Sequence, residues 1–500
     1  MNVKRQYIRF SVYVEPLMGV CSNQIGYLRQ QAIFVVIALF LFTPYAHAFD
    51  IASPFYDPLR TLPERIESGV TLPGDSKPAT CPVNKDFTTS VTLVDAIDLA
   101  LCNNPQLKGT WAAIKVQSGA VGEARAAYLP SISGSFNYMF NRSVYPGSTV
   151  AATETDGETM SATLGWRLFD FGGRDANRKS ANYLLIAAIT HHDAMLQKTL
   201  ADVVQAYFEA HTAKATVQAK EQSEAYAKDT LETAQRRETL GAAAHSDTLQ
   251  AISALAKASL EKNRAIGVFN KAISVLLYTL GVPTQTHITL SEISRIEESE
   301  NSKSLKDWLA ITAEMHPAIL SARALWKSSV YKISSVRSEG LPSVDITANY
   351  YQNGYPGQGL SSLQSQISNI GISISFPFFD GFSRTYKIRG AEALAEQHAA
   401  ELQDTEHNTM MEVVKTFADA ESSLQNLQAS DSLLNAAQES FSASQRKYSK
   451  GVSDILEVLN TQTVLSDAMQ EHIRSLSEWH SARLRLLACV GVLGREKVSR

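Results

Sequence analysis

Long hydrophobic runs are almost absent from this sequence of 500 residues. The one unbroken apolar run, residues 32–42, has eleven residues, whereas a membrane-spanning helix needs about 20. A bundle of transmembrane helices is therefore excluded. The run follows Arg29 and precedes Ala-His-Ala at residues 46–48, which is the pattern of an export signal and its cleavage site. We expect residues 1–48 to be a signal peptide and the exported chain to start at Phe49.

Cysteine is scarce as well, with four residues in the whole sequence. Cys21 lies in the expected signal peptide, and the other three are too scattered for a metal site or a disulfide framework. Cys81 and Cys102 could pair in an oxidising periplasm, whereas Cys489 lies in an apolar helical stretch that is typical of a buried thiol. Because the residue directly after the expected cleavage site is Phe49 and not a cysteine, we expect no lipid anchor.

An excess of positive charge and the motifs of common enzymes are also missing. Loss of the signal peptide removes 4 of 46 basic and 1 of 50 acidic residues, which leaves 42 against 49 and a net charge of −7. Nucleic acid is a poor partner for such a chain. There is no phosphate-binding loop, metalloprotease helix or nucleophile elbow, and His191-His192-Asp193 fits a solvent-facing helical stretch better than a metal site. We expect no catalytic residues, metal or other cofactor.

The strongest positive feature is an internal duplication. Residues of the same type recur 210 positions apart over more than a hundred residues, which chance does not explain. The clearest pairs are Asp170 with Asp380, Arg174 with Arg384, Gly241 with Gly451, and Gly281 with Gly491. The resulting division of the chain is a signal peptide (1–48), a Pro-rich extended segment (49–90), a first repeat (91–282), a polar linker (283–304), a second repeat (305–494) and a tail (495–500).

Each repeat is predicted to contain one β-hairpin. Apolar and polar residues alternate with the period of a strand at residues 132–140, 162–168, 344–350 and 370–376. The loops inside the hairpins are expected at residues 143–159 and 352–366, which carry Pro, Gly, Ser and Thr. The apolar face is rich in aromatic residues, which favours a lipid-facing wall, and the alternative is an ordinary buried core face.

Very long helices are predicted after each hairpin. Residues 174–240 contain neither Gly nor Pro, so a helix here would be about 100 Å long. Its mate, residues 383–450, contains only Gly390. Two shorter helical stretches per repeat are predicted to stack end to end beside the long helix, at 105–128 with 242–280 and at 317–339 with 452–490. Apolar stripes at Leu200, Val203, Val204, Tyr207 and Phe208, and again at Met410, Val413, Val414 and Phe417, are expected to pack helix against helix.

Four amphipathic strands cannot close a membrane barrel, because known spanning barrels begin at eight strands and an open sheet edge is not tolerated in lipid. The chains must therefore pool their strands. The duplication, the Tyr128-Leu129-Pro130 strand entry, the sequence LFDFGGR at 168–174 and the glycine turns together resemble the TolC family of outer membrane channels over residues 91–494.

This resemblance implies an α+β membrane protein and a homotrimer. Its 12-stranded transmembrane β-barrel, with four strands per chain, would continue into a long periplasmic α-helical barrel. It implies an exit duct in the outer membrane of a Gram-negative bacterium, in contact with outer membrane lipid, a periplasmic adaptor and an inner-membrane ABC or proton-driven transporter. The alternative is a soluble periplasmic adaptor with a coiled-coil hairpin, against which the duplication argues.

The resemblance also places a gate and the adaptor-docking surface at the helical tips, around Gly241 and Gly451. Arg237 and Arg446 close by fit charges that complement the dipole at a helix C-terminus, and contact with the adaptor is the alternative. Residues that match or replace the family's constriction pattern are Tyr448, Glu457, Asn460, Ser453, Asp247 and Ser246. Asn460 replaces an acid of that pattern, and Ser453 replaces a basic residue. We expect a hydrogen bond between Tyr448 and Asp247 to hold the tips closed, and three Glu457 carboxylates to favour cations.

Overall fold

The computed structural model describes residues 57–61, 90–147, 149, 151–291, 303–353 and 365–494. The predicted signal peptide, Cys81, most of the Pro-rich segment, half of the linker, and the tail lie outside the described residues. Contacts divide the chain at Pro58, and the elements below all belong to the unit Leu59–Arg500. Among the described residues, no helix is both long enough and apolar enough to cross a membrane.

The predicted long helices are confirmed, with ends that shift by a few residues. Helices α6 (Gly173–Thr239) and α10 (Ser383–Ser449) have 67 residues each. The return helices α7 (His245–Thr279) and α11 (Ile455–Cys489) have 35 residues each. Shorter helices precede each hairpin, namely α4 (Leu93–Asn103) and α5 (Pro105–Ala126) in the first repeat, and α8 (Leu305–Met315) and α9 (Pro317–Ser338) in the second.

The end-to-end stacking of the shorter helices is also confirmed. The end of α7 meets the start of α5, where the Asn104 side-chain amide donates a hydrogen bond to the Thr279 carbonyl at 3.5 Å. A side-chain carbon placed on Gly281 would lie only 2.7 Å from the Asn103 backbone. The second repeat joins α11 to α9 in the same way, with Gly491 against Pro317. Each repeat thus supplies two parallel rods of similar length.

The main apolar core lies at this joint between the stacked helices. All five residues of the predicted α6 stripe, Leu200 to Phe208, are buried in it with Ile97 of α4. In the second repeat Val413 is buried, but Val414 is 42% exposed, so the predicted stripe is wrong at that position. The reason is that α10 packs mainly against three helices, α8, α9 and α11, whereas α6 packs against five, α4, α5, α7, α9 and α11.

The four predicted strands form one antiparallel sheet in the order β1-β2-β3-β4. Their bounds are β1 Ser131–Ser143, β2 Thr153–Phe169, β3 Ser343–Gln352 and β4 Gln366–Ser375. The loop predicted at 143–159 was too long, because the polar start of β2 still pairs with β1. Cross-strand polar contacts hold that part of the hairpin, including the ion pair between Arg142 and Glu154 at 3.2 Å.

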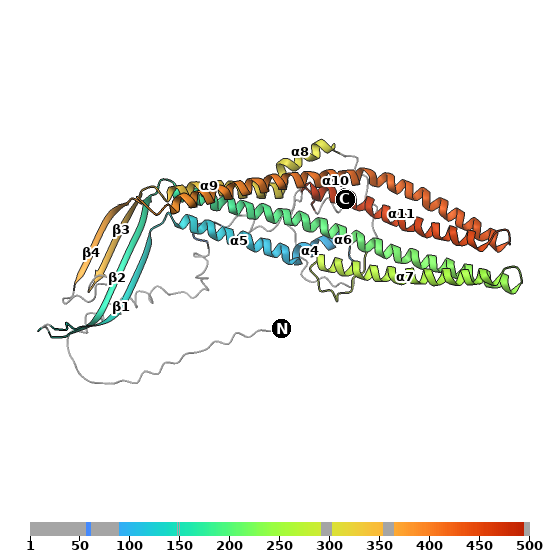
Figure 1. Ribbon diagram of the computed structural model, residues 1–500, viewed down its shortest axis with the longest axis horizontal. Helices are drawn as coiled ribbons and strands as arrows, with labels where there is room; N and C mark the ends of the chain where they lie inside the picture. The colour runs from blue at the N-terminus through green and yellow to red at the C-terminus, as the bar shows by residue number, and fades with distance from the viewer. Residues whose placement is uncertain are drawn as a thin grey trace, which may run out of the picture. The chain divides into compact units, whose positions relative to one another are not determined.

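The apolar face of the sheet is open, and the described sheet pairs each of its outer strands, β1 and β4, on one side only. Ile132 of β1 is 76% exposed and Ile370 of β4 is 80% exposed. The alternative of an ordinary buried core face is therefore wrong for the single chain. Figure 1 shows this sheet at one end of the helical rods and the α6–α7 and α10–α11 turns at the other.

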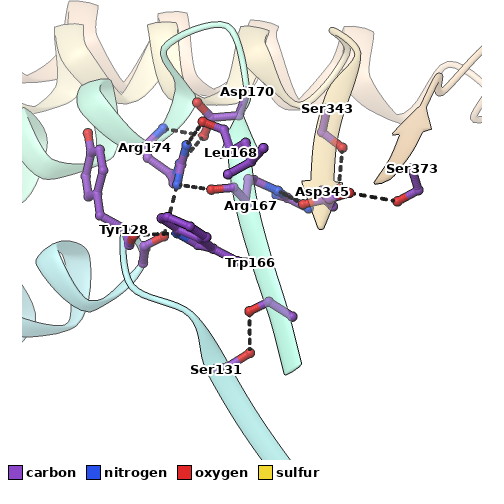
Figure 2. Close-up of polar contacts among 12 residues, drawn as sticks. Tyr128, Ser131, Trp166, Arg167, Leu168, Asp170, Arg174, Ser343, Asp345 and Ser373 are labelled. Carbon is purple, nitrogen blue, oxygen red and sulfur yellow. Dashed lines mark hydrogen bonds and ion pairs between the residues drawn. The ribbon is translucent and has the colours of Figure 1, made fainter. Parts of the chain in front are cut away.

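A polar cluster fixes the angle between strand β2 and helix α6 (Figure 2). The turn uses two successive left-handed residues, Phe171 and Gly172. Arg174, in the first turn of α6, donates to the Arg167 carbonyl at 2.7 Å and the Leu168 carbonyl at 3.0 Å, and it pairs with Asp170 at 3.1 Å. The same Asp-to-Arg spacing recurs at Asp380 and Arg384, where the charged groups lie 3.8 Å apart. The duplicated pair is thus a strand-to-helix connector.

Candidate functional site

Both helical hairpins end in the same kind of tight turn. Gly241 and Gly451 have left-handed backbones, with φ of 70° and 80°. The amide after each glycine reaches back to the last helical turn, from Ala242 to the Arg237 carbonyl at 2.8 Å and from Val452 to the Lys447 carbonyl at 2.9 Å. This is the Schellman cap, which favours glycine because other residues are strained at positive φ. The glycine turns predicted from the sequence are confirmed as turns.

Arg237 connects the two turns. One of its guanidinium nitrogens donates to the Tyr448 carbonyl at 2.6 Å, and the other donates to the Ala242 carbonyl at 3.1 Å. The guanidinium also lies over the Tyr448 ring, 4.4 Å from the ring centre. Tyr448 itself is buried, with Phe441 and Ile455, in a small apolar cluster at the tips. Arg237 of the first hairpin therefore binds the end of the second hairpin at Tyr448.

The expected hydrogen bond between Tyr448 and Asp247 is not present. The Tyr448 hydroxyl is buried and has no hydrogen-bond partner among the described residues. Burial raises the pKa of Tyr448 above its usual value; the nearby Asp247 charge adds to this, whereas Arg237 opposes it. The physical reason for the difference is that Arg237 contacts the ring face and the carbonyl of Tyr448, so that the interaction between the hairpins does not use the Tyr448 hydroxyl.

Glu457 is engaged within its own hairpin. It accepts a hydrogen bond from the Ser453 hydroxyl at 2.5 Å and lies 3.4 Å from the Lys447 ammonium. These two partners, the Ser453 hydroxyl first, lower the pKa of Glu457, which therefore stays ionised at neutral pH. The main chain of Glu457 is fixed as well, since its amide donates to the Asp454 side chain at 2.9 Å, which caps α11.

The other predicted tip residues lie on the surface. Ser246 is exposed and donates to Asp247 at 3.4 Å. Asn460 is exposed on α11, and Arg446 is exposed in the last turn of α10. The structure thus brings Tyr448, Asp247 and Arg237 together, keeps Ser453 with Glu457, and leaves Asn460 and Arg446 open to solvent.

Sequence reasoning missed a row of polar contacts between the two hairpins. Lys220 of α6 donates to Ser466 of α11 at 3.0 Å and pairs with Glu261 of α7 at the same distance. Nearer the tips, Gln445 of α10 donates to Asp229 of α6 at 2.6 Å. These residue types are common on exposed helix surfaces, so nothing in the sequence distinguished them.

The two neighbouring histidines on α6 have different surroundings. His191 is exposed, but His192 is buried and hydrogen-bonded to the Thr110 hydroxyl at 2.7 Å, so the prediction of a solvent-facing stretch is wrong for His192. No group of three or more metal-ligating side chains occurs within the described ranges. Of the cysteines, Cys102 is disulfide-bonded, while Cys489 is a free thiol whose pKa is raised by burial.

Comparison with known proteins identifies the family. The family described as "Outer membrane efflux protein" matches residues 96–272 and 308–492, one stretch in each repeat. The chain belongs to this family. The family consists of channels and is not an enzyme family, and the resemblance to TolC-type channels is confirmed. The protein is therefore an outer membrane channel of the secretion and efflux class, and the alternative interpretation as a soluble adaptor is wrong.

Relatives of this efflux protein family match over most of the chain. CyaE of Bordetella pertussis is 32% identical over 442 residues, which cover 87% of this chain and 92% of CyaE. The alkaline protease secretion protein AprF of Pseudomonas aeruginosa is 24% identical, covering 80% of this chain and 84% of AprF. Among solved structures, the Campylobacter jejuni outer membrane channel CmeC superimposes with a TM-score of 0.73 at 15% identity, covering 85% of this chain and 95% of CmeC, which shows the shared fold.

Proposed function

We propose that this protein is the exit duct of a type I secretion system that passes protein cargo. The observation that carries this proposal is the similarity to AprF, whose name states alkaline protease secretion and of which 84% is covered, and the match to CyaE supports it with 32% identity over 92% of CyaE. The duct would work as a homotrimer, docked through a periplasmic adaptor on an inner-membrane ABC transporter. A duct of this kind has no catalytic step, since the pump supplies the energy and selects the cargo.

The open sheet edges support the trimer. Strands β1 and β4 carry unpaired main-chain groups on one side each, within the described sheet, and their apolar face is exposed. Unpaired amides and carbonyls are too costly to leave in lipid, so each edge needs a partner strand. Pairing β1 of one chain with β4 of the next removes every edge when the ring closes, and three chains then supply the strands of one barrel.

The first expected result follows from this closure. Detergent-extracted protein is expected to be a trimer, with no folded monomer of similar stability, because an isolated chain leaves both edges open. Native mass spectrometry of the extracted protein measures this directly. A predominant monomer or dimer that keeps its β-sheet circular dichroism signal would contradict the shared barrel.

A second expected result concerns the cargo. Deleting the gene in its host should remove specific proteins from the culture supernatant and leave tolerance to dyes, detergents and antibiotics near the level of the parent strain. A strain complemented with a plasmid copy is the control, and supernatant proteomics with growth assays gives both readouts. Loss of tolerance with an unchanged set of supernatant proteins would instead indicate small-molecule efflux through the same duct.

In the same proposal, the tips form the gate and the adaptor-docking surface. The turns at Gly241 and Gly451 would present Arg237 and Arg446 to the adaptor. The residues that would surround the constriction are Tyr448, Asp247, Ser246, Ser453, Glu457 and Asn460. The ionised Glu457 of each chain supports a preference for cations, and the neighbouring Lys447, 3.4 Å away, weakens that preference.

A further inference from the structure

The duplication places a basic residue at the same point of both hairpins. Arg237 and Lys447 are related by the 210-residue repeat, and each lies four residues before the turn glycine. The two side chains nevertheless do different things. Lys447 reaches Glu457 within its own hairpin at 3.4 Å, whereas Arg237 reaches across to the Tyr448 carbonyl at 2.6 Å. The two repeats therefore differ in the partner of this basic residue, although its position is the same in both.

The contact is formed where two helices end. The Tyr448 carbonyl lies in the last turn of α10, and the Ala242 carbonyl lies just beyond the end of α6. The Tyr448 carbonyl already accepts the Gly451 amide at 3.0 Å, and it carries the partial negative charge of a helix C-terminus, so the Arg237 cation adds a charge-assisted hydrogen bond there. One guanidinium donates to the Tyr448 and Ala242 carbonyls at once and also stacks on the Tyr448 ring.

A lysine at position 237 could not make all of these contacts. An ammonium is a compact charge, whereas the planar guanidinium offers several donors in fixed directions and a flat face for the ring. The Gly451 turn lies directly beside the guanidinium, since a side-chain carbon on Gly451 would be in ordinary van der Waals contact with it, at 3.7 Å.

We infer that Arg237 is the tie that holds the two hairpins of each chain together at the tip and so keeps the periplasmic end of the channel closed. This rests on the proposed gate at the tips. Arg237 acts as a positioning residue, since it fixes Tyr448 and the end of α10 and needs no contact with cargo.

The channel measurement uses purified full-length protein in planar lipid bilayers. Arg237→Ala is expected to raise single-channel conductance, because losing charge-assisted hydrogen bonds should shift the closed-to-open ratio by about tenfold or more in each chain. Arg237→Lys should fall between Arg237→Ala and the parent protein. The matched control is Arg236→Ala, which removes the same charge one residue away; Arg236 contacts Glu232 and Thr233 of its own helix.

A second readout does not depend on the channel. Tyr448 is 2% exposed in the closed tip, so chymotrypsin should cut after it several times faster in Arg237→Ala than in Arg236→Ala. Cleavage after Leu240, which is 81% exposed, is the internal reference and should be equal in the two variants. This measurement also detects a variant that fails to fold, because cleavage would then spread along the rods.

Two results would overturn the inference. One is parent-like conductance and parent-like Tyr448 cleavage in an intact Arg237→Ala trimer, and the other is an equal effect of Arg236→Ala and Arg237→Ala. If the parent protein forms no channel at all, the proposed duct is wrong, while the protease readout still decides whether Arg237 ties the hairpins.

Discussion

Gly281→Ala is expected to be among the most damaging single substitutions in the helical rods. Gly281 ends α7 with a left-handed backbone of φ 67°, and a methyl group there would lie 2.7 Å from the Asn103 carbonyl carbon and 2.8 Å from its oxygen. The left-handed conformation costs a residue with a side chain about 1–2 kcal/mol, and overpacking against backbone adds about 1–3 kcal/mol. We expect a loss of about 2–5 kcal/mol from the free energy of unfolding.

The matched control is Gly241→Ala at the tip. Gly241 has nearly the same backbone, with φ 70°, but nothing lies within 4 Å of the position that a methyl group would take. Only the conformational cost should then remain, about 1–2 kcal/mol. Denaturant unfolding followed by helical circular dichroism compares the two variants. Equal losses would show that the joint between α7 and α5 yields to the added methyl group and that the rods are less tightly stacked.

His316 is expected to make the protein sensitive to acid. It precedes α9, where its Nδ1 accepts a hydrogen bond from the Ala318 amide at 3.3 Å while the ring also bonds the Cys489 backbone. Burial lowers the pKa of His316 from 6.5 to about 4. A proton on Nδ1 would remove the acceptor that caps the helix. The folded protein therefore favours the neutral form of the His316 ring.

The direction of the pH dependence follows from this shift. Above pH 6.5 the ring is neutral in both folded and unfolded chains, and its contribution to stability is complete. As the pH falls from 6.5 towards 4, the unfolded chain binds a proton that the folded chain excludes, so stability is lost. At pH 4 the loss should reach about 3 kcal/mol per chain.

His316→Asn separates this titration from the cap. The first repeat already uses Asn104 at the equivalent place, where its side chain accepts from the Gln106 amide at 2.8 Å and donates to the Thr279 carbonyl. Asparagine should therefore keep both bonds without a titrating group. We expect parent and variant to have similar thermal midpoints at pH 7.5 and the variant to be clearly more stable at pH 4.5. Parallel pH profiles would mean that other groups cause the acid sensitivity.

Much of the architecture was predictable because local sequence rules govern it. A stretch without Gly or Pro from 174 to 240 has no helix-breaking residue, and α6 spans Gly173–Thr239 accordingly. Period-two alternation located all four strands. It failed only at the start of β2, where polar residues such as Glu154 pair with β1 through contacts that a search for apolar residues overlooks.

The candidate gate was predictable in its location and less so in its contacts. Gly241 and Gly451 marked the turns, because a left-handed helix end favours glycine, and the family pattern pointed to Tyr448. The partner of Tyr448 was predicted as Asp247, and the structure supplies Arg237 instead. Both residues lie near the ring, so a resemblance by position could not tell which of them makes the bond.

The sequence by itself determined the rods, the strands, the turns and the need for several chains, since each depends on residues that are close along the chain or on a count of strands. Only the tertiary structure decided what joins one hairpin to the other. Arg237 and Tyr448 are 211 residues apart, and their contact depends on the lateral register of α6 against α10 and α11. That register is set by the packing of many side chains across the rods. Helical periodicity fixes only the face of the helix on which each residue lies.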